Sequence, residues 1–405
     1  MKRGVIVLLA ALFFAVLWRA PAVIIHPSGG VYMPDVRFDF ANAFTWAVMT
    51  AFAFYVASEI NVWVGLFFVL ASWSAYSPIN TSQSEQSHHF VLYGIILYSL
   101  SVHYLNTPKA QRWTMNTMCC IAMVHLLLLF GQTVYNFDPL YVGLKPLYAS
   151  TKFDPVPNVG LLSCVNDASI MLAIILPAFF RRGWIYLTPL FLFGFVATHS
   201  FVGPLAASVT SISYIATKYK IGWLKIAFVG ILALLCLQLY VKYVDEPDLG
   251  WRWKAWKSAL LAKDMVNPLT GVMNKKWKYT GIGIGHWKLV YSRKDVAVHT
   301  QGQFFAQAHN EPIQMQTEMG YGFPLILTGF LLSVIFRFRL KAILPTSALI
   351  AILITSNTFF VFHISFLAMV SILWMAMLQN TLKPSRSYLY LRSFFTRASS
   401  GPKQA

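Results

Sequence analysis

The chain has 405 residues, of which 57% are hydrophobic and 11% charged, and its formal net charge is +18. Runs of about 16 to 20 apolar residues recur along it, which is typical of a polytopic helical membrane protein and excludes a soluble enzyme. A positive charge of this size can indicate a protein that binds nucleic acid. Much of it, however, lies in short loops between apolar runs, where such residues orient a membrane protein, and we expect no nucleic-acid partner.

The apolar runs predict about twelve transmembrane helices, beginning with an uncleaved span in "MKRGVIVLLAALFFAVLW". We expect an all-α polytopic membrane protein, with residues 1–405 forming a single transmembrane domain and both termini in the cytoplasm. The basic loops that support this orientation contain Arg181 and Arg182, Lys218 and Lys220, Arg337 to Lys341, and the tail after Lys383. The predicted spans are 5–25, 41–58, 60–77, 88–105, 113–131, 159–180, 184–199, 202–217, 223–241, 322–337, 342–359 and 362–380.

Two of these spans join at "THSFVGP", where Pro204 is expected to interrupt helix bonding. Several spans are short enough to need neighbouring support, and irregular backbone at membrane depth usually lines a cavity. The longest external connection, residues 242–320, is expected to form a helical loop subdomain over such a cavity.

Within this loop, "WRWKAWKSALLAK" is expected to form a helix at the membrane interface, because its apolar side chains share one arc at about 100° per residue. Arg252 lies within this arc, one turn before Trp256. Two interpretations of Arg252 stay open. It either faces the protein and needs an anionic partner, or reaches lipid phosphates with Trp256 packed on its stem.

The glycines of the following segment, "KYTGIGIGHW", could suggest a nucleotide-binding loop. No lysine-serine pair follows them and no strand-helix unit surrounds them, which argues against that interpretation. We expect these glycines to allow close backbone packing under the loop instead.

The most chemically distinctive stretch is "AQAHNEPIQMQTEMGYGFP", residues 306–324. Asn310 is expected to cap a helix over 311–319, because Pro312 in its first turn lacks only an amide that would be unpaired there anyway. Gly320 would end this helix. His309 then precedes a helix N-terminus, where oriented amides favour a neutral imidazole that can accept a proton.

Other polar residues leave two interpretations each. Glu318 is expected to receive a hydrogen bond from the loop or to orient an acceptor, or else simply to be solvated at the helix N-terminus or the interface. Asp167, deep in a predicted span, would serve either proton coupling or helix pinning. His299, His309, Glu311 and Glu318 match no familiar metal-ligand spacing, so we expect no metal.

Three motifs of the second half resemble the O-antigen ligase and polymerase family of membrane glycosyltransferases. "HNEPIQMQTEMGYGFPLIL" is similar to the family's histidine-asparagine motif with its glutamate and glycines. "WRWKAWKSALL" with "GIGIGHW" is similar to its arginine, tryptophan and glycine-rich turn. "VPNVGLLSCVNDASIMLAIILP" is similar to its asparagine-bearing middle span.

The resemblance implies a glycosyltransferase C-type-like fold that needs no cofactor or metal. Its active site would lie on the periplasmic side of the bacterial inner membrane. The donor would be a glycan linked to undecaprenyl pyrophosphate, and the acceptor a hydroxyl of lipid A core or of a similar glycan or lipid. His309 would activate the acceptor hydroxyl and Arg252 would hold the pyrophosphate, with inversion at the sugar carbon. The further substrate-binding residues would be Asn158, Trp256, Asn310 and Glu318.

The chain departs from this family at "SFVGP", where Phe201 occupies the place of a common arginine. Lys145, Lys152 or a lysine of 275–278 would then have to compensate. Within the family, an O-antigen polymerase or a protein O-oligosaccharyltransferase is an equally open function. From other classes, a transporter or flippase using His125 and Asp167, or a non-catalytic homologue, stays open.

Overall fold

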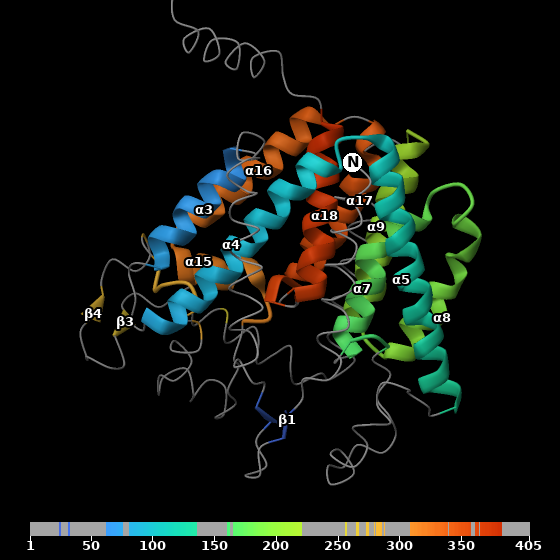
Figure 1. Ribbon diagram of the computed structural model, residues 1–405, viewed down its shortest axis with the longest axis horizontal. Coiled ribbons are helices and arrows are strands. Elements are labelled where there is room, and N and C mark those ends of the chain that lie inside the picture. Colours follow the sequence, from blue (N-terminus) through green and yellow to red (C-terminus); the bar gives the residue numbers. More distant parts are fainter. Residues whose placement is uncertain are drawn as a thin grey trace, which may run out of the picture.

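The computed structural model (Figure 1) describes residues 24–25, 31–32, 62–75, 81–135, 160–162, 165–220, 256, 265–266, 273–274, 279, 281–285, 287, 308–338, 340–357, 361–363 and 365–382. Within this part of the chain the fold is all-α, as predicted. Its α-helices are α3 (Val62–Ala75), α4 (Thr81–Tyr104), α5 (Pro108–Tyr135), α7 (Val165–Phe179), α8 (Pro189–Thr198), α9 (Val202–Lys218), α15 (Glu311–Met319), α16 (Gly322–Arg337), α17 (Ile343–Ser356) and α18 (Ser365–Thr381). Short 3-10 helices are η3 (Ile185–Leu187), η4 (Leu340–Ala342) and η5 (Val361–His363).

Two antiparallel ladders of two residue pairs accompany the helices. They join β1 (Ile24–Ile25) to β2 (Val31–Tyr32) and β3 (Met265–Val266) to β4 (Met273–Asn274). The prediction that the first span extends to residue 25 is wrong at its end, because Ile24 and Ile25 pair as a strand instead. Both are β-branched residues, which suit an extended backbone.

The spans predicted between 60 and 217 and between 322 and 380 each coincide with a helix, and α16 has the predicted bounds. The spans at 41–58 and 223–241 and nearly all of 5–25 lie outside the described residues. Among the described helices, α5 is the one long and apolar enough to cross a membrane by itself. Helices α3, α7, α16, α17 and α18, and α8 together with η3, are apolar but shorter.

Helix α7 is the centre of the main core. Every residue from Asp167 to Phe179 is buried, because α5, α8, α9, α17 and α18 all pack against it (Figure 1). Its Phe179 ring meets Phe191 of α8 edge-to-face at 4.7 Å between ring centroids. A helix that is apolar on all sides is expected at such a position.

Helices α7 and α9 approach closely because α9 presents small residues to its neighbours. A side chain at Gly203 would meet both the hydroxyl and the carbonyl of Ser169 on α7. Pro204 follows in the first turn of α9 and does not interrupt the helix, contrary to the prediction. The physical reason is that a first-turn residue has no intrahelical partner for its amide, so proline removes nothing there.

The helices run between two ends of the bundle. At the first, which we call the α15 end, Ser74 at the end of α3 donates to the Glu318 carbonyl, and Asn310 donates to the Asn357 carbonyl after α17. At the opposite end, Asn380 of α18 donates to the Val102 carbonyl of α4. We call this opposite end the basic end.

Charge is separated completely between these ends in the described part of the chain. The acidic residues of the described part belong to helices and lie at the α15 end; they are Glu85, Asp167, Glu311 and Glu318. Its lysines and arginines lie at the basic end, and they are Lys109, Arg112, Arg181, Arg182, Lys218, Lys220, Arg337 and Lys341.

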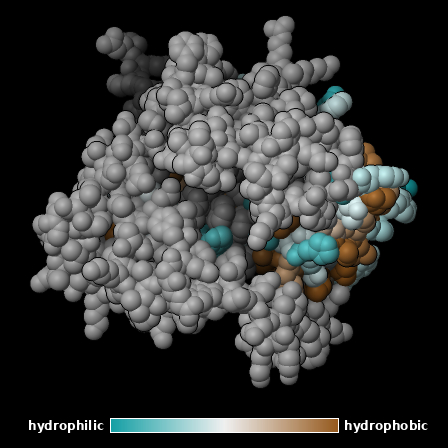
Figure 2. Space-filling view, turned by 90° about the horizontal axis from the view of Figure 1, so that it is seen from below, coloured by the Kyte–Doolittle hydropathy of each residue, from teal (hydrophilic) through white to brown (hydrophobic). Residues whose placement is uncertain are grey.

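Large apolar side chains cover much of the outer helix surface. Leu127 of α5, Val196 of α8 and Leu325 of α16 are 66%, 71% and 72% exposed. Seen from below (Figure 2), hydrophobic surface gathers on the right, the side on which Figure 1 has α5 and α8. In this arrangement apolar residues face both the core and the surroundings of the bundle.

Candidate functional site

His309 is held in a fixed backbone frame at the start of α15. Its φ of 51° lies in the left-handed region, which costs about 1–2 kcal/mol for a residue with a side chain. The preceding residue is fixed on both sides, since Ala308 N donates to Gln314 Oε1 at 3.0 Å and Trp256 Nε1 donates to the Ala308 carbonyl at 2.6 Å. Together these bonds set where the half-buried imidazole emerges.

Asn310 caps α15, as predicted from the sequence. Its side-chain oxygen accepts from Ile313 N at 3.0 Å, while its Nδ2 donates to the Asn357 carbonyl at 2.9 Å. Because Pro312 has no amide hydrogen and Ile313 already donates to the cap, little of this helix N-terminus remains to hold an anion.

The two carboxylates of α15 link it to other segments. Glu311, 3% exposed, accepts from Phe362 N of η5 at 2.9 Å. Glu318, 1% exposed, accepts from Trp287 N at 3.0 Å and from Gln314 Nε2 at 3.3 Å. The predicted hydrogen bond from the loop to Glu318 is thus confirmed, and this bond gives the residue a positioning role. Its contact with substrate stays a prediction.

The glycine-rich segment docks on α15 through its backbone, which confirms the predicted close packing. Ile282 N donates to the Thr317 carbonyl and Gly283 N to the Glu318 carbonyl, both at 3.1 Å. Side chains at Gly281 or Gly320 would collide with backbone atoms across this contact, and both glycines have positive φ, 76° and 73°. Glycine is required at these positions for space and for conformation.

Trp256 connects this site with the predicted arginine helix. It is the one residue of "WRWKAWKSALLAK" among those described, and it is helical and half-buried. Arg252, four residues earlier in the sequence, lies outside the described residues, as do Asn158, Lys145, Lys152 and the lysines of 275–278. All of the described lysines and arginines lie at the basic end, which is the opposite end of the bundle from His309.

Phe201 occupies the N-cap position of α9, at the turn between α8 and α9. Beside it, Ser200 donates to Asn166 Oδ1 at 2.8 Å. The turn between α8 and α9, residues 199–201, contains no lysine or arginine.

His125 and Asn166 are bonded within the protein, as expected of polar residues in apolar helices. His125 Nδ1 accepts from Leu161 N at 3.0 Å, and the turn at Gly160 is fixed further by Gln132, whose Oε1 accepts from Gly160 N at 2.8 Å. These contacts pin the segment before α7 to α5. Asp167 is buried at the start of α7.

Sequence reasoning missed three residues that build this end of the molecule, namely Gln132, Trp287 and Gln314. Gln314 could have been found from its i, i+4 spacing to Glu318 on one helix face. Gln132 could have been found as an amide within an apolar helix, whereas nothing in the sequence indicated the backbone contact of Trp287.

No group of three histidine, cysteine, aspartate or glutamate residues in the described part of the chain could hold a metal ion. The arrangement offers a half-buried histidine on a fixed backbone frame. No protein-family model matches the chain, and no curated protein matches it.

Proposed function

We propose that the chain is a polytopic membrane protein of about twelve transmembrane helices in a glycosyltransferase C-type-like arrangement. The short apolar helices, the exposed apolar side chains of α5, α8 and α16 and the complete charge separation support this proposal. By the positive-inside rule the basic end faces the cytoplasm with both termini, and the α15 end faces the periplasm of the bacterial inner membrane.

At the α15 end, we propose, the protein transfers a glycan from undecaprenyl pyrophosphate to an acceptor hydroxyl. The observation that carries this proposal is the frame of His309, in which Trp256 donates to the residue before the histidine. Trp256 follows Arg252 by four residues, which is one turn of the helix predicted there, so a donor phosphate held by Arg252 and an acceptor hydroxyl at His309 would belong to one site. The resemblance of the same two motifs to the O-antigen ligase family agrees with it.

The chemistry needs only positioning, charge stabilisation and a base. His309 takes the proton of the acceptor hydroxyl as its oxygen bonds to the anomeric carbon. The bond from this carbon to the pyrophosphate oxygen breaks on the opposite face, giving inversion and undecaprenyl pyrophosphate as leaving group. Arg252 stabilises the charge that develops on the leaving oxygens. Glu318 and Asn310 keep α15, and so the base, in place.

The test uses the full-length protein in liposomes with a labelled lipid-linked glycan. His309→Ala is expected to lower transfer by about 100 to 10,000-fold, the usual contribution of a general base. The matched control is His199→Ala, because His199 is also a non-glycine residue in the left-handed region, with φ 48°, but lies outside the frame of α15. Normal transfer by His309→Ala, or equal losses in both variants, would contradict the proposal.

Three acceptors in parallel reactions identify the function within the family. Product on lipid A core indicates a ligase, elongation of a second lipid-linked glycan indicates a polymerase, and product on a pilin-like peptide indicates a protein oligosaccharyltransferase. Arg252→Ala and Arg252→Lys are added to each reaction. If Arg252 holds the pyrophosphate, lysine restores transfer only partly, because it lacks the bidentate fork of the guanidinium.

A further inference from the structure

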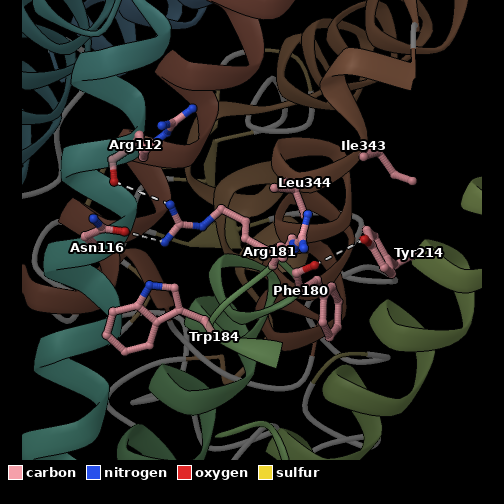
Figure 3. A pocket seen from close by; sticks show the side chains of 9 residues that line it. Arg112, Asn116, Phe180, Arg181, Trp184, Tyr214, Ile343 and Leu344 are labelled. Atoms are coloured by element: carbon pink, nitrogen blue, oxygen red, sulfur yellow. Dashed lines mark hydrogen bonds between the residues drawn. The ribbon is translucent and has the colours of Figure 1, made fainter. Parts of the chain in front are cut away.

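A second site lies at the basic end, where a cavity of about 590 Å³ opens between the ends of α5, α7, α9 and α17. Figure 3 shows Arg112 and Asn116 on one side of it, Tyr214 and Leu344 on the other, and Arg181 between them. Leu344 is in the first turn of α17, whereas the contact with Asn310 is made after its last turn. The 14 residues of α17 therefore separate the two sites by about 20 Å.

Three guanidinium groups line this cavity, from Arg112, Arg181 and Arg182, and no carboxylate of the described residues lines it with them. Arg181 is half-buried and is held by neutral acceptors. Its Nη2 donates to Asn116 Oδ1 at 2.7 Å and its Nε to the Ala178 carbonyl at 2.9 Å. Its Nη1 donates to the Arg112 carbonyl at 3.5 Å, while Arg112 and Arg182 are themselves exposed. Phosphate is the anion that arginine forks match best.

The remaining wall of the cavity is aromatic and aliphatic. The Phe180 ring stacks on Tyr214 with 4.5 Å between ring centroids, and Trp184 and Leu344 complete this wall. A site that combines arginines with aromatic and aliphatic groups suits an amphiphile with a phosphate head. Its volume lies within the range of about 300–1,000 Å³ that is usual for small-molecule sites.

We propose that this pocket binds the phosphate group of an anionic phospholipid from the cytoplasmic leaflet. Basic pockets between transmembrane helices on this side of a membrane recognise such head groups. The assignment to a lipid rests on the membrane orientation proposed above, but it does not depend on glycan transfer, because the pocket lies at the opposite end of the bundle from His309.

The test compares two double variants with the same loss of charge. Arg112→Gln/Arg182→Gln removes two exposed pocket cations, while Lys220→Gln/Arg337→Gln removes two exposed cations of the same end that do not line the pocket. Each protein is reconstituted in nanodiscs of phosphatidylcholine with or without phosphatidylglycerol and is then released under mild conditions. Native mass spectrometry measures how many lipid molecules remain bound to the intact protein.

The wild type and the Lys220→Gln/Arg337→Gln protein are expected to retain one phosphatidylglycerol molecule. The pocket variant is expected to lose about tenfold or more in affinity, since each charge-assisted hydrogen bond is worth roughly that factor. An equal loss of bound phosphatidylglycerol in both double variants would contradict the proposed pocket, because it would show that the lipid is held by the general positive charge of this surface.

A second arm distinguishes a lipid from a free anion. Thermal unfolding is followed in detergent with added phosphatidylglycerol or with inorganic phosphate. Stabilisation by the lipid alone, lost in the pocket variant, supports the proposal. Equal stabilisation by inorganic phosphate would overturn the lipid assignment, and unchanged retention of lipid by all variants would overturn the site. Because these measurements need no sugar substrate, a failure of the glycosyltransferase proposal leaves their outcome unaffected.

Discussion

Replacing Gly281 by alanine tests whether the glycine-rich segment and α15 are held together by backbone contact. A Cβ atom at this position would fall onto the Glu318 carbonyl, and the position has a φ of 76°. Gly183 offers a matched control, since its φ is 97° but nothing lies within 4 Å of where its Cβ would be. Alanine at Gly183 therefore introduces conformational strain without a collision.

The expected cost differs between the two variants. Conformational strain alone amounts to about 1–2 kcal/mol for each of them. Gly281→Ala also separates the two backbones, so that the hydrogen bonds from Ile282 N to Thr317 O and from Gly283 N to Glu318 O are lost. At about 0.5–1.5 kcal/mol for each bond, the total becomes about 2–5 kcal/mol.

The assay is thermal unfolding of both purified variants in the same detergent, followed by glycan transfer below their unfolding temperatures. Gly281→Ala is expected to unfold at a clearly lower temperature than Gly183→Ala and to lose transfer, because the frame of His309 depends on α15. Equal unfolding temperatures for the two variants would refute the inference that this backbone contact holds the site together.

Two further substitutions test single contacts. Asn310→Ala removes the side-chain oxygen that accepts from Ile313 N and the amide that donates to the Asn357 carbonyl. Loss of the helix cap alone costs about 0.5–2 kcal/mol of stability. Asn310→Ser keeps an oxygen that can cap the helix. Asn310→Ser should therefore unfold at an intermediate temperature, and equal losses in the two would contradict the capping role. Gly203→Ala should destabilise the pair α7 and α9 by about 1–3 kcal/mol through overpacking. Ser169→Ala should not rescue it, because the Ser169 carbonyl still lies 2.6 Å from the new Cβ; full rescue in thermal unfolding would contradict this.

Local signals were sufficient to predict the helices. Helix α15 has the predicted bounds because Asn310, Pro312 and Gly320 act on the backbone within one or two turns of themselves. The same holds for α16, whose apolar run ends at Arg337. Pro204 was misjudged although the predicted span 202–217 begins where α9 begins, because the effect of proline depends on which turn of a helix contains it, and the first turn tolerates it.

Contacts between distant segments could not be predicted in the same way. For Glu318 the sequence left a bond from the loop, a contact with the acceptor and simple solvation all open, and only the tertiary structure shows that it accepts from Trp287 N while 1% exposed. Hydrogen bonds of this kind join residues whose separation in sequence carries no periodic signal. Buried carboxylates therefore look alike in sequence, whether they hold a fold together or a substrate.

The sequence by itself determined the all-α character, the helix cap before α15 and the placement of basic residues in one set of loops, because apolar runs, capping residues and loop charges act locally. Only the tertiary structure shows that Arg181 donates to the carbonyl of Arg112, 69 residues away in the sequence, and that both residues line one pocket. Only the tertiary structure shows that Trp256 donates to the carbonyl of Ala308, the residue before His309. Both contacts follow from how the helices pack, and packing depends on the shapes of all neighbouring side chains at once.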